Sequence, residues 1–304
     1  MVFQFPKNFT SKDAYKIWSI VSKIDNGIGI TIDLTYLKYV DAEGTNYIVL
    51  FPYLFKSKFQ NIQIILPPSD MNVYQFLNDC GVFDMLKRDF TVIEYCVLDF
   101  SSNKFSYNKK RSANNKYIPF FKSFVFNTKE QSNIFNTLSN NYDIFKRNID
   151  LSTRATKCLT ELIFNVYDHS EQDFCCITLN FKNEGKNKIP YLFICVSDLG
   201  IGIKNSFLKS PRFSKSVYKR KGDNYYIAAA VTTGYSSTDL QNRGFGLPLV
   251  LHNSNKLLIS TGNCRSSFTK YDEDFTAIKE YKTYRVKRMI GTSIVALIKG
   301  HEIT

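Results

Sequence analysis

LSTRATKCLTELIFNVYDHS, residues 151–170, is the stretch that decides the fold of this chain. Its apolar side chains recur with the spacing of a helix that is buried along one face: Ala155, Leu159, Leu162, Ile163 and Val166. Either Ser152 or Thr153 is suited to cap the start of such a helix. The stretch therefore predicts an amphipathic helix with one polar face.

That polar face carries Glu161, Asn165 and His169, which are spaced four residues apart and form one stripe. A carboxylate one turn from an amide suits metal-assisted chemistry, because the carboxylate can accept a proton and the amide oxygen can bind Mg²⁺. The alternative is a solvated polar stripe that ends with His169 at the negative end of the helix dipole.

A second motif follows an apolar run. Residues 191–196 predict a strand, which ends at Ser197 and Asp198, and Gly200 and Gly202 allow a tight turn after it. An acid at such a strand end can accept a hydrogen bond from an exocyclic amine such as that of adenine. The alternative is an ordinary turn between a strand and a loop.

Two glycine motifs follow towards the C-terminus. Residues 242–247 read NRGFGL and lead into a predicted helix that extends to about residue 255. Glycines at a helix start expose backbone amides that favour phosphate oxygens, although a plain helix entry has the same composition. Gly291 and Thr292 open the apolar run 294–298, which predicts a final strand.

In this order the four motifs resemble the GHKL (histidine kinase-like, Bergerat fold) ATP-binding domain. Histidine kinases, anti-sigma-factor serine kinases, type II topoisomerases, mismatch-repair ATPases and heat-shock chaperones share this domain. The match covers roughly residues 126–304, and the helix that ends in histidine is most similar to that of the anti-sigma-factor kinases. A histidine kinase-like α/β sandwich is therefore expected here.

The resemblance implies a role for each matching residue. Glu161 would be the general base, Asn165 the Mg²⁺ ligand and Asp198 the reader of adenine. The remaining nucleotide-binding positions would be His169, Gly200, Gly202, Arg243, Gly244, Gly246, Leu247 and Thr292. The implied cofactors are ATP and Mg²⁺.

Residues 198–202, DLGIG, resemble the first glycine box of this family, and residues 243–247, RGFGL, resemble the second. In this family the segment between the two boxes, here residues 204–243, is a lid over the phosphates. Here it contains eight Lys or Arg against two Asp, and a basic lid suits a triphosphate. Residues 233–238, TGYSST, resemble the Gly-Ser-Thr stretch of the kinase lid. The alternative is a solvated loop in which only Arg243, next to the second glycine box, has a role.

The first hundred residues predict a smaller α/β domain. Strands are expected over 28–34 and 62–66, and helices over 45–55 and 73–80. Residues 15–100 resemble a STAS domain, the fold of anti-sigma-factor antagonists, in which a serine at a helix start is phosphorylated. Ala42 occupies that position, so phosphorylation there is not expected, and Glu43 either mimics the charge or suits the helix dipole.

Between these parts, residues 101–127 predict a basic linker rich in aromatic residues. Residues 101–130 carry seven Lys or Arg and one Glu, a large share of the net charge of +13. Interleaved aromatic residues could stack bases, but a solvated linker is the favoured interpretation. The expected organisation is a STAS-like domain over 1–100, a linker over 101–127 and an ATP-binding domain over 128–304.

Composition sets the remaining expectations. The seven cysteines form no CxxC pair and fit free thiols in a reducing cytoplasm. No signal peptide and no apolar run long enough to span a membrane is recognisable.

Three functions follow from these patterns. The chain is an ATPase switch that controls protein interaction or dimerisation, a serine/threonine kinase acting on a separate partner, or a non-catalytic ATP sensor. The first is favoured, because the STAS-like domain lacks the acceptor serine. Histidine autophosphorylation is disfavoured, because neither His252 nor His301 lies in a dimerisation-helix motif ahead of the ATP domain.

Overall fold

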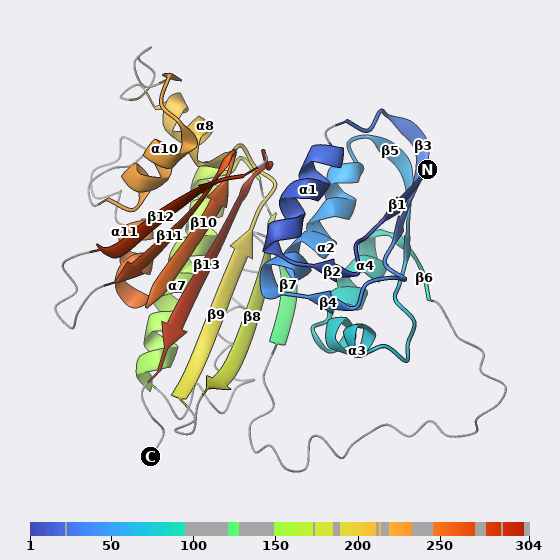
Figure 1. Cartoon of the computed structure of the whole chain (residues 1–304), viewed down its shortest axis with the longest axis horizontal. Helices are drawn as coiled ribbons and strands as arrows, with labels where there is room; N and C mark the ends of the chain where they lie inside the picture. The colour runs from blue at the N-terminus through green and yellow to red at the C-terminus, as the bar shows by residue number, and fades with distance from the viewer. Residues whose placement is uncertain are drawn as a thin grey trace.

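The described part of the chain forms an α/β structure, as expected, with two main sheets of four and seven strands and a separate pair of short strands (Figure 1). The computed structural model describes residues 1–21, 23–94, 121–127, 149–172, 174–184, 189–210, 213, 219–232, 246–270, 278–286 and 288–300. The smaller sheet belongs to the N-terminal part, and the larger one to the C-terminal part.

The N-terminal part is a parallel sheet of four strands in the order β1-β3-β5-β6. Its strands are β1 (Val2–Gln4), β3 (Gly27–Asp33), β5 (Phe59–Ile65) and β6 (Thr91–Ile93), with β2 (Asn8–Phe9) and β4 (Tyr39–Val40) paired beside it. Parallel strands need crossover connections, which here are α1 (Ser11–Val21), α2 (Ala42–Phe55), α3 (Asn72–Asp79) and α4 (Val82–Asp89). Each strand and helix predicted over residues 28–80 is present.

Helix α2 begins at the motif that resembles the STAS phosphorylation site. Asp41 caps it, because its side chain accepts a hydrogen bond of 2.7 Å from the Gly44 amide. An added Cβ at Gly44 would lie 2.7 Å from the Phe9 carbonyl oxygen, so this close approach requires glycine. Glu43 is buried and forms an ion pair with Arg265 of the C-terminal part, a role that the sequence did not indicate.

The C-terminal part is an antiparallel sheet of seven strands in the order β12-β11-β10-β13-β9-β8-β7. The strands are β7 (Phe121–Asn127), β8 (Phe174–Glu184), β9 (Ile189–Ser197), β10 (Lys256–Thr261), β11 (Cys264–Lys270), β12 (Ile278–Arg285) and β13 (Thr292–Lys299). The helices are α7 (Ile149–His169), α8 (Gly202–Lys209), α10 (Asp223–Ala230) and α11 (Gly246–Asn253). The apolar face of α7 packs on one face of this sheet.

The predicted linker over 101–127 is too long at its C-terminal end. Residues 121–127, FKSFVFN, form strand β7, which pairs with β8 at the edge of the large sheet. This short stretch has no regular apolar–polar alternation, so its sequence does not distinguish a strand from the end of a linker. Residues 101–120, with the other basic and aromatic side chains discussed for this segment, lie outside the described part of the chain.

Helix α2 packs on the opposite face of the large sheet, against β8 and β9. Successive side chains of β8 show the two faces: Ile177 belongs to the core beneath α7, whereas Cys176 belongs to the N-terminal core. Figure 1 shows the N-terminal part beside strands β7–β9, with α7 on the other side of the sheet. The large sheet is therefore covered by its own helices on one face and by the N-terminal domain on the other.

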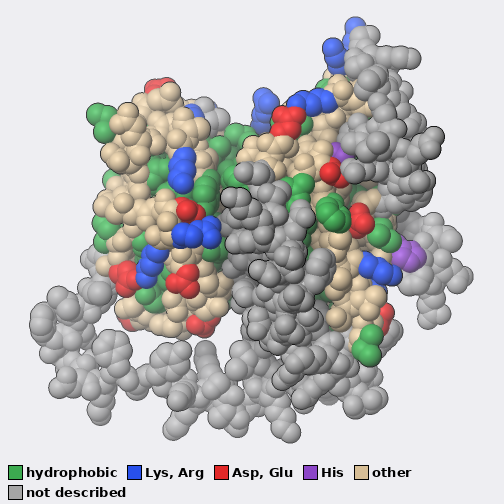
Figure 2. Space-filling view, turned by 180° about the vertical axis from the view of Figure 1, so that it is seen from behind, with side chains coloured by type: hydrophobic (Ala, Val, Ile, Leu, Met, Phe, Trp, Pro, Cys, Tyr) green, Lys and Arg blue, Asp and Glu red, His purple; other side chains and the backbone are tan. Residues whose placement is uncertain are grey.

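The described surface carries both signs of charge. Figure 2 shows acidic and basic side chains interspersed over both parts, with basic side chains at the upper edge of the C-terminal part. Lys219, Arg220 and Lys221, which precede α10, are all exposed. None of the helices in the described part of the chain is sufficiently long and apolar to cross a membrane.

Candidate functional site

Helix α7 presents the predicted stripe as expected. Its buried side chains include Leu159, Leu162 and Val166, whereas Glu161 and Asn165 are only partly buried. His169 is the last residue of the helix. The amphipathic pattern therefore fixes which face of α7 carries the polar residues.

Gly246, the first residue of α11, lies directly against this stripe. The position that a Cβ would take at Gly246 is 3.1 Å from Glu161 Oε2 and 3.3 Å from Asn165 Oδ1. Gly246 thus meets residues that precede it by 81 and 85 positions in the chain, and the glycine leaves room for the two polar side chains. The next residue, Leu247, is buried in the core beneath α7 and anchors the start of α11.

The polar ends of Asn165 and Glu161 have the properties of functional groups. Asn165 Nδ2 is buried, and it has no hydrogen-bond partner among the described residues. Burial raises the pKa of Glu161, and the negative charge of Asp168 adds to this effect. A buried amide without a partner and a carboxylate with a raised pKa are typical of a site that binds or transforms a ligand.

Asp198 follows the end of β9 and is buried, with 5% of its surface exposed. Its Oδ1 accepts a hydrogen bond of 2.7 Å from the Gly200 amide. Burial raises the pKa of this carboxyl to about 7, although the amides of Gly200 and Thr292 oppose the shift. The aspartate therefore changes its charge near neutral pH.

The loop after Asp198 packs on the end of α7. A Cβ at Gly200 would lie 2.2 Å from the Ser170 carbonyl oxygen, which also accepts a hydrogen bond of 3.0 Å from the Ile201 amide. Because Ser170 follows His169 directly, this contact joins the first glycine box to the end of the helix that carries Glu161 and Asn165. Only glycine permits this contact at position 200.

The strand β13 begins beside Asp198. The Asp198 amide donates to the Thr292 carbonyl oxygen at 2.9 Å, and a Cβ at Gly291 would lie 2.0 Å from the Asp198 carbonyl oxygen. Gly291 has a φ of 76°, which also favours glycine. The predicted Gly291-Thr292 motif is thus placed against the predicted base-reading aspartate.

Thr261, at the end of β10, completes this end of the site and was missed from the sequence. Its hydroxyl donates to the Gly291 carbonyl oxygen at 3.0 Å and accepts from the Ile203 amide at 3.3 Å. The Thr292 hydroxyl lies 3.5 Å from it. A hydroxyl residue just before Gly262 at a strand end was the available signal, but such residues are common at turns.

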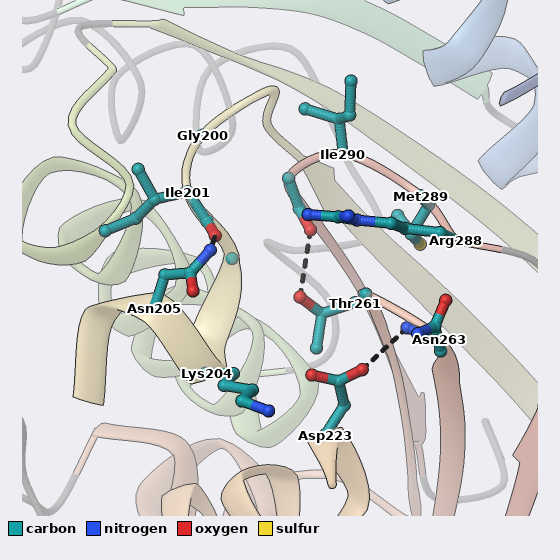
Figure 3. A pocket seen from close by; sticks show the side chains of 13 residues that line it. Gly200, Ile201, Lys204, Asn205, Asp223, Thr261, Asn263, Arg288, Met289 and Ile290 are labelled. Carbon is teal, nitrogen blue, oxygen red and sulfur yellow. Dashed lines mark hydrogen bonds between the residues drawn. The ribbon is translucent and has the colours of Figure 1, made fainter. Parts of the chain in front are cut away.

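A pocket of about 450 Å³ adjoins the first glycine box (Figure 3). It lies between α8, the start of α10 and the turns that precede β11 and β13. Of the predicted residues, Gly200 and Gly202 line it, whereas Glu161, Asn165, Asp198 and Thr292 do not. Lys204 and Arg288 contribute two positive charges to its wall, and Asp223 contributes one carboxylate.

Some of the predicted site lies outside the described part of the chain. Arg243, Gly244 and the TGYSST stretch belong to the segment 233–245. Within the predicted lid, the structure describes α8 and α10, which pack together through Phe207, Phe213 and Tyr226. The structure thus brings together Glu161, Asn165 and Gly246 at one junction, and Asp198, Gly200 and Thr292 at another.

Comparison with protein-family models and with curated proteins found no match to this chain. Among the described residues, no cluster of three or more His, Cys, Asp or Glu side chains could hold a metal ion.

Proposed function

We propose that the C-terminal part of this chain binds Mg-ATP and hydrolyses it. Closure of the basic segment 204–243 over the nucleotide then controls contact with a protein partner or with a second copy of the chain. The observation that carries the proposal is the approach of Gly246 to Glu161 and Asn165, which joins the second glycine box to the polar stripe on α7.

Asp198 is suited to read the base. Its ionised carboxylate can accept a hydrogen bond from the adenine amino group, and the Thr292 hydroxyl lies on the adjoining strand. The Gly200 and Thr292 amides hold the carboxylate in place, so that it need not rearrange when the base binds. A pKa of about 7 means that much of the ionised form is present at neutral pH.

The start of α11 is suited to the phosphates. The amides of Gly246, Leu247 and Leu249 in the first turn have no partners within the helix, whereas Pro248 has no amide hydrogen, and the positive end of the dipole favours anions. Gly246 places this turn beside Glu161 and Asn165, where the reacting phosphate would have to lie. The exposed Lys219, Arg220 and Lys221 add positive charge near α10.

Asn165 fits the role of a Mg²⁺ ligand, because its side-chain oxygen lies beside the start of α11, next to the Glu161 carboxylate. Its amide nitrogen is a donor without a hydrogen-bond partner in the described part of the chain, and it would suit a phosphate oxygen. Its side-chain oxygen would hold the ion. When bound, Mg²⁺ supplies positive charge that screens the phosphate oxygens. Magnesium is usually held by few protein groups together with water and phosphate, which suits a site without an acidic cluster.

Glu161 fits the role of the general base. Its carboxylate lies beside Asn165 and Gly246, and it would accept the proton of an attacking water. The raised pKa makes it a stronger proton acceptor at neutral pH than an exposed glutamate. If a serine of another protein took the place of water, the same geometry would support a kinase.

Phosphate release from Mg-ATP by the wild type and by Glu161→Gln tests this proposal. We expect release by the wild type and a decrease of about 10²- to 10⁴-fold in the variant, with Mg-ATP binding retained. Lys157→Ala, an exposed change on the same helix, serves as the control and should leave release unchanged. Equal release by Glu161→Gln and wild type would contradict the assigned base. Binding without release, with phosphate transferred to a partner protein, would favour the kinase.

A further inference from the structure

Asn46 of α2 is buried between the two domains with none of its surface exposed. Its Nδ2 donates to the carbonyl oxygens of Cys176 and Cys195, at 3.1 and 3.2 Å, and to Ser197 Oγ at 3.0 Å. Its Oδ1 accepts a hydrogen bond of 2.5 Å from the Thr178 hydroxyl. A side chain from the N-terminal domain therefore ties β8 to β9 of the C-terminal sheet.

This contact lies directly behind the candidate base-reading residues. Ser197 precedes Asp198 in the chain, and its hydroxyl lies 2.9 Å from that of Ser293, which follows Thr292. Successive side chains of a strand point to opposite faces. The two serines therefore face α2, whereas Asp198 and Thr292 face the side of the sheet that α7 covers.

Two further residues next to the site belong to the N-terminal core. Leu199, between Asp198 and Gly200, packs against this core, and Met289, just before the turn at Gly291, is buried in it. The N-terminal domain thus contacts the segment that follows β9 and the segment that precedes β13, next to the candidate base-reading residues. The C-terminal sheet would lose these contacts if the domains separated.

We propose that Asn46 is a positioning residue for the nucleotide site. It holds the end of β9, so that the Asp198 carboxylate and the start of β13 keep their alignment. The inference rests on the proposed function and adds to it a role for the N-terminal domain: docking of α2 tunes nucleotide affinity. Because such coupling is reciprocal, bound nucleotide strengthens the docking of α2 by the same factor.

Mg-ATP titration calorimetry with Asn46→Ala and Thr178→Val tests the proposal. Thr178 lies on β8, opposite Cys195 of β9, and its hydroxyl donates to Asn46, so the valine removes one hydrogen bond to the amide and leaves the bonds that Asn46 donates in place. We expect affinity to fall about tenfold in Asn46→Ala and by a smaller factor in Thr178→Val, in line with the loss of one to several hydrogen bonds. If Asn46→Ala does not fold, Thr178→Val decides the question.

Val73→Ala is the matched control. Val73 is buried in α3, in the N-terminal core and away from the large sheet, so this change also destabilises the domain. It should leave the affinity within twofold of wild type. Equal weakening by Val73→Ala and Asn46→Ala, or unchanged affinity in both Asn46→Ala and Thr178→Val, would overturn the positioning role.

A second readout needs no nucleotide. The titration midpoint of the Asp198 carboxyl is measured by carbon-detected NMR, with Asp198→Asn used to assign the signal. We expect Asn46→Ala to shift this midpoint and Val73→Ala to leave it in place. If the wild type binds no Mg-ATP, the proposed function fails while this titration still decides whether Asn46 positions Asp198; an unmoved midpoint in Asn46→Ala would reject the positioning role.

Discussion

Glu43 on α2 and Arg265 on β11 form an ion pair of 3.1 Å that is buried between the two domains. Only 4% of the Glu43 side chain and 16% of the Arg265 side chain are exposed. Tyr47 donates to the same carboxylate at 3.3 Å, and Arg265 donates to the Tyr15 hydroxyl at 3.5 Å. The N-terminal domain is thus joined to the large sheet by paired charges as well as by apolar packing.

Removing one partner of this pair should be costly. Burial raises the pKa of Glu43 and Arg265 opposes that shift, so Arg265→Met leaves a buried carboxylate without its counter-charge. We expect a loss of about 3–5 kcal/mol in the free energy of unfolding, measured by urea denaturation. The double variant Glu43→Leu/Arg265→Met should lose less than the single change.

The exposed pair of Lys16 and Asp13, in which 70% of the lysine side chain is exposed, provides the comparison. Lys16→Met should cost less than about 1 kcal/mol. Similar losses for Arg265→Met and Lys16→Met would show that the interdomain pair does not contribute as described.

Gly246→Ala should impair the site more than the fold. The added Cβ would lie 3.1–3.4 Å from the polar atoms of Glu161 and Asn165, so these side chains must move by a few tenths of an ångström. Alanine favours a helix by about 1 kcal/mol over glycine, which offsets part of the strain. We expect phosphate release to fall at least about tenfold, as geometric misplacement does in other sites, with an unfolding temperature near that of wild type.

Gly291→Ala should damage both fold and site. Its φ of 76° disfavours alanine, and the added Cβ would overlap the Asp198 carbonyl oxygen at 2.0 Å. We expect a loss of about 3 kcal/mol or more, measured as the free energy of unfolding. Gly29→Ala is the control, because its Cβ would make only an ordinary contact of 3.6 Å with the Asn61 carbonyl oxygen. If both variants unfold alike, the tight turn at Gly291 is not required.

Asp198 should make stability depend on pH around neutrality. Its pKa is about 7 in the folded chain, against 3.8 for an ordinary aspartate, so the folded state binds the proton more tightly. The resulting stabilisation is complete below the unfolded value and is lost as the pH rises through about 7. Between pH 6 and pH 8 the wild type should lose about 1.4 kcal/mol from this group.

The free energy of unfolding of the wild type and of Asp198→Asn is measured by urea denaturation at both pH values. The difference between the two proteins isolates this contribution, because all other groups titrate in both. The asparagine keeps an oxygen that can accept the Gly200 amide, so the variant is expected to fold. An equal change between the two pH values in both proteins would contradict the raised pKa of Asp198.

Local patterns predicted much of this fold. The helix α7 was recognisable because its apolar spacing is that of a buried helix face, and β9 and β13 were recognisable as apolar runs next to glycines. Strand β7 was not, because its seven residues follow a basic, polar segment and their pairing partner lies some fifty residues later.

The contacts between domains could not be predicted from local patterns. Asn46 and Glu43 are polar residues in a helix whose other side chains are largely apolar. Only the fold shows that Asn46 bonds to Ser197 and that Glu43 pairs with Arg265. Thr261 was missed for the same reason, because its role depends on β10 lying next to β13. Sequence spacing identified the candidate residues, whereas their convergence depends on long-range strand order.

The central claim is tested most directly by calorimetric titration of Mg-ATP into the wild type and Asp198→Asn at pH 8, where the aspartate is ionised. We predict saturable binding at a single site by the wild type and a loss of affinity of at least about tenfold in the variant, because the carboxylate that accepts the adenine amine is gone. Absence of binding by the folded wild type, or equal affinity in both proteins, would contradict the assignment of this site to adenine nucleotides.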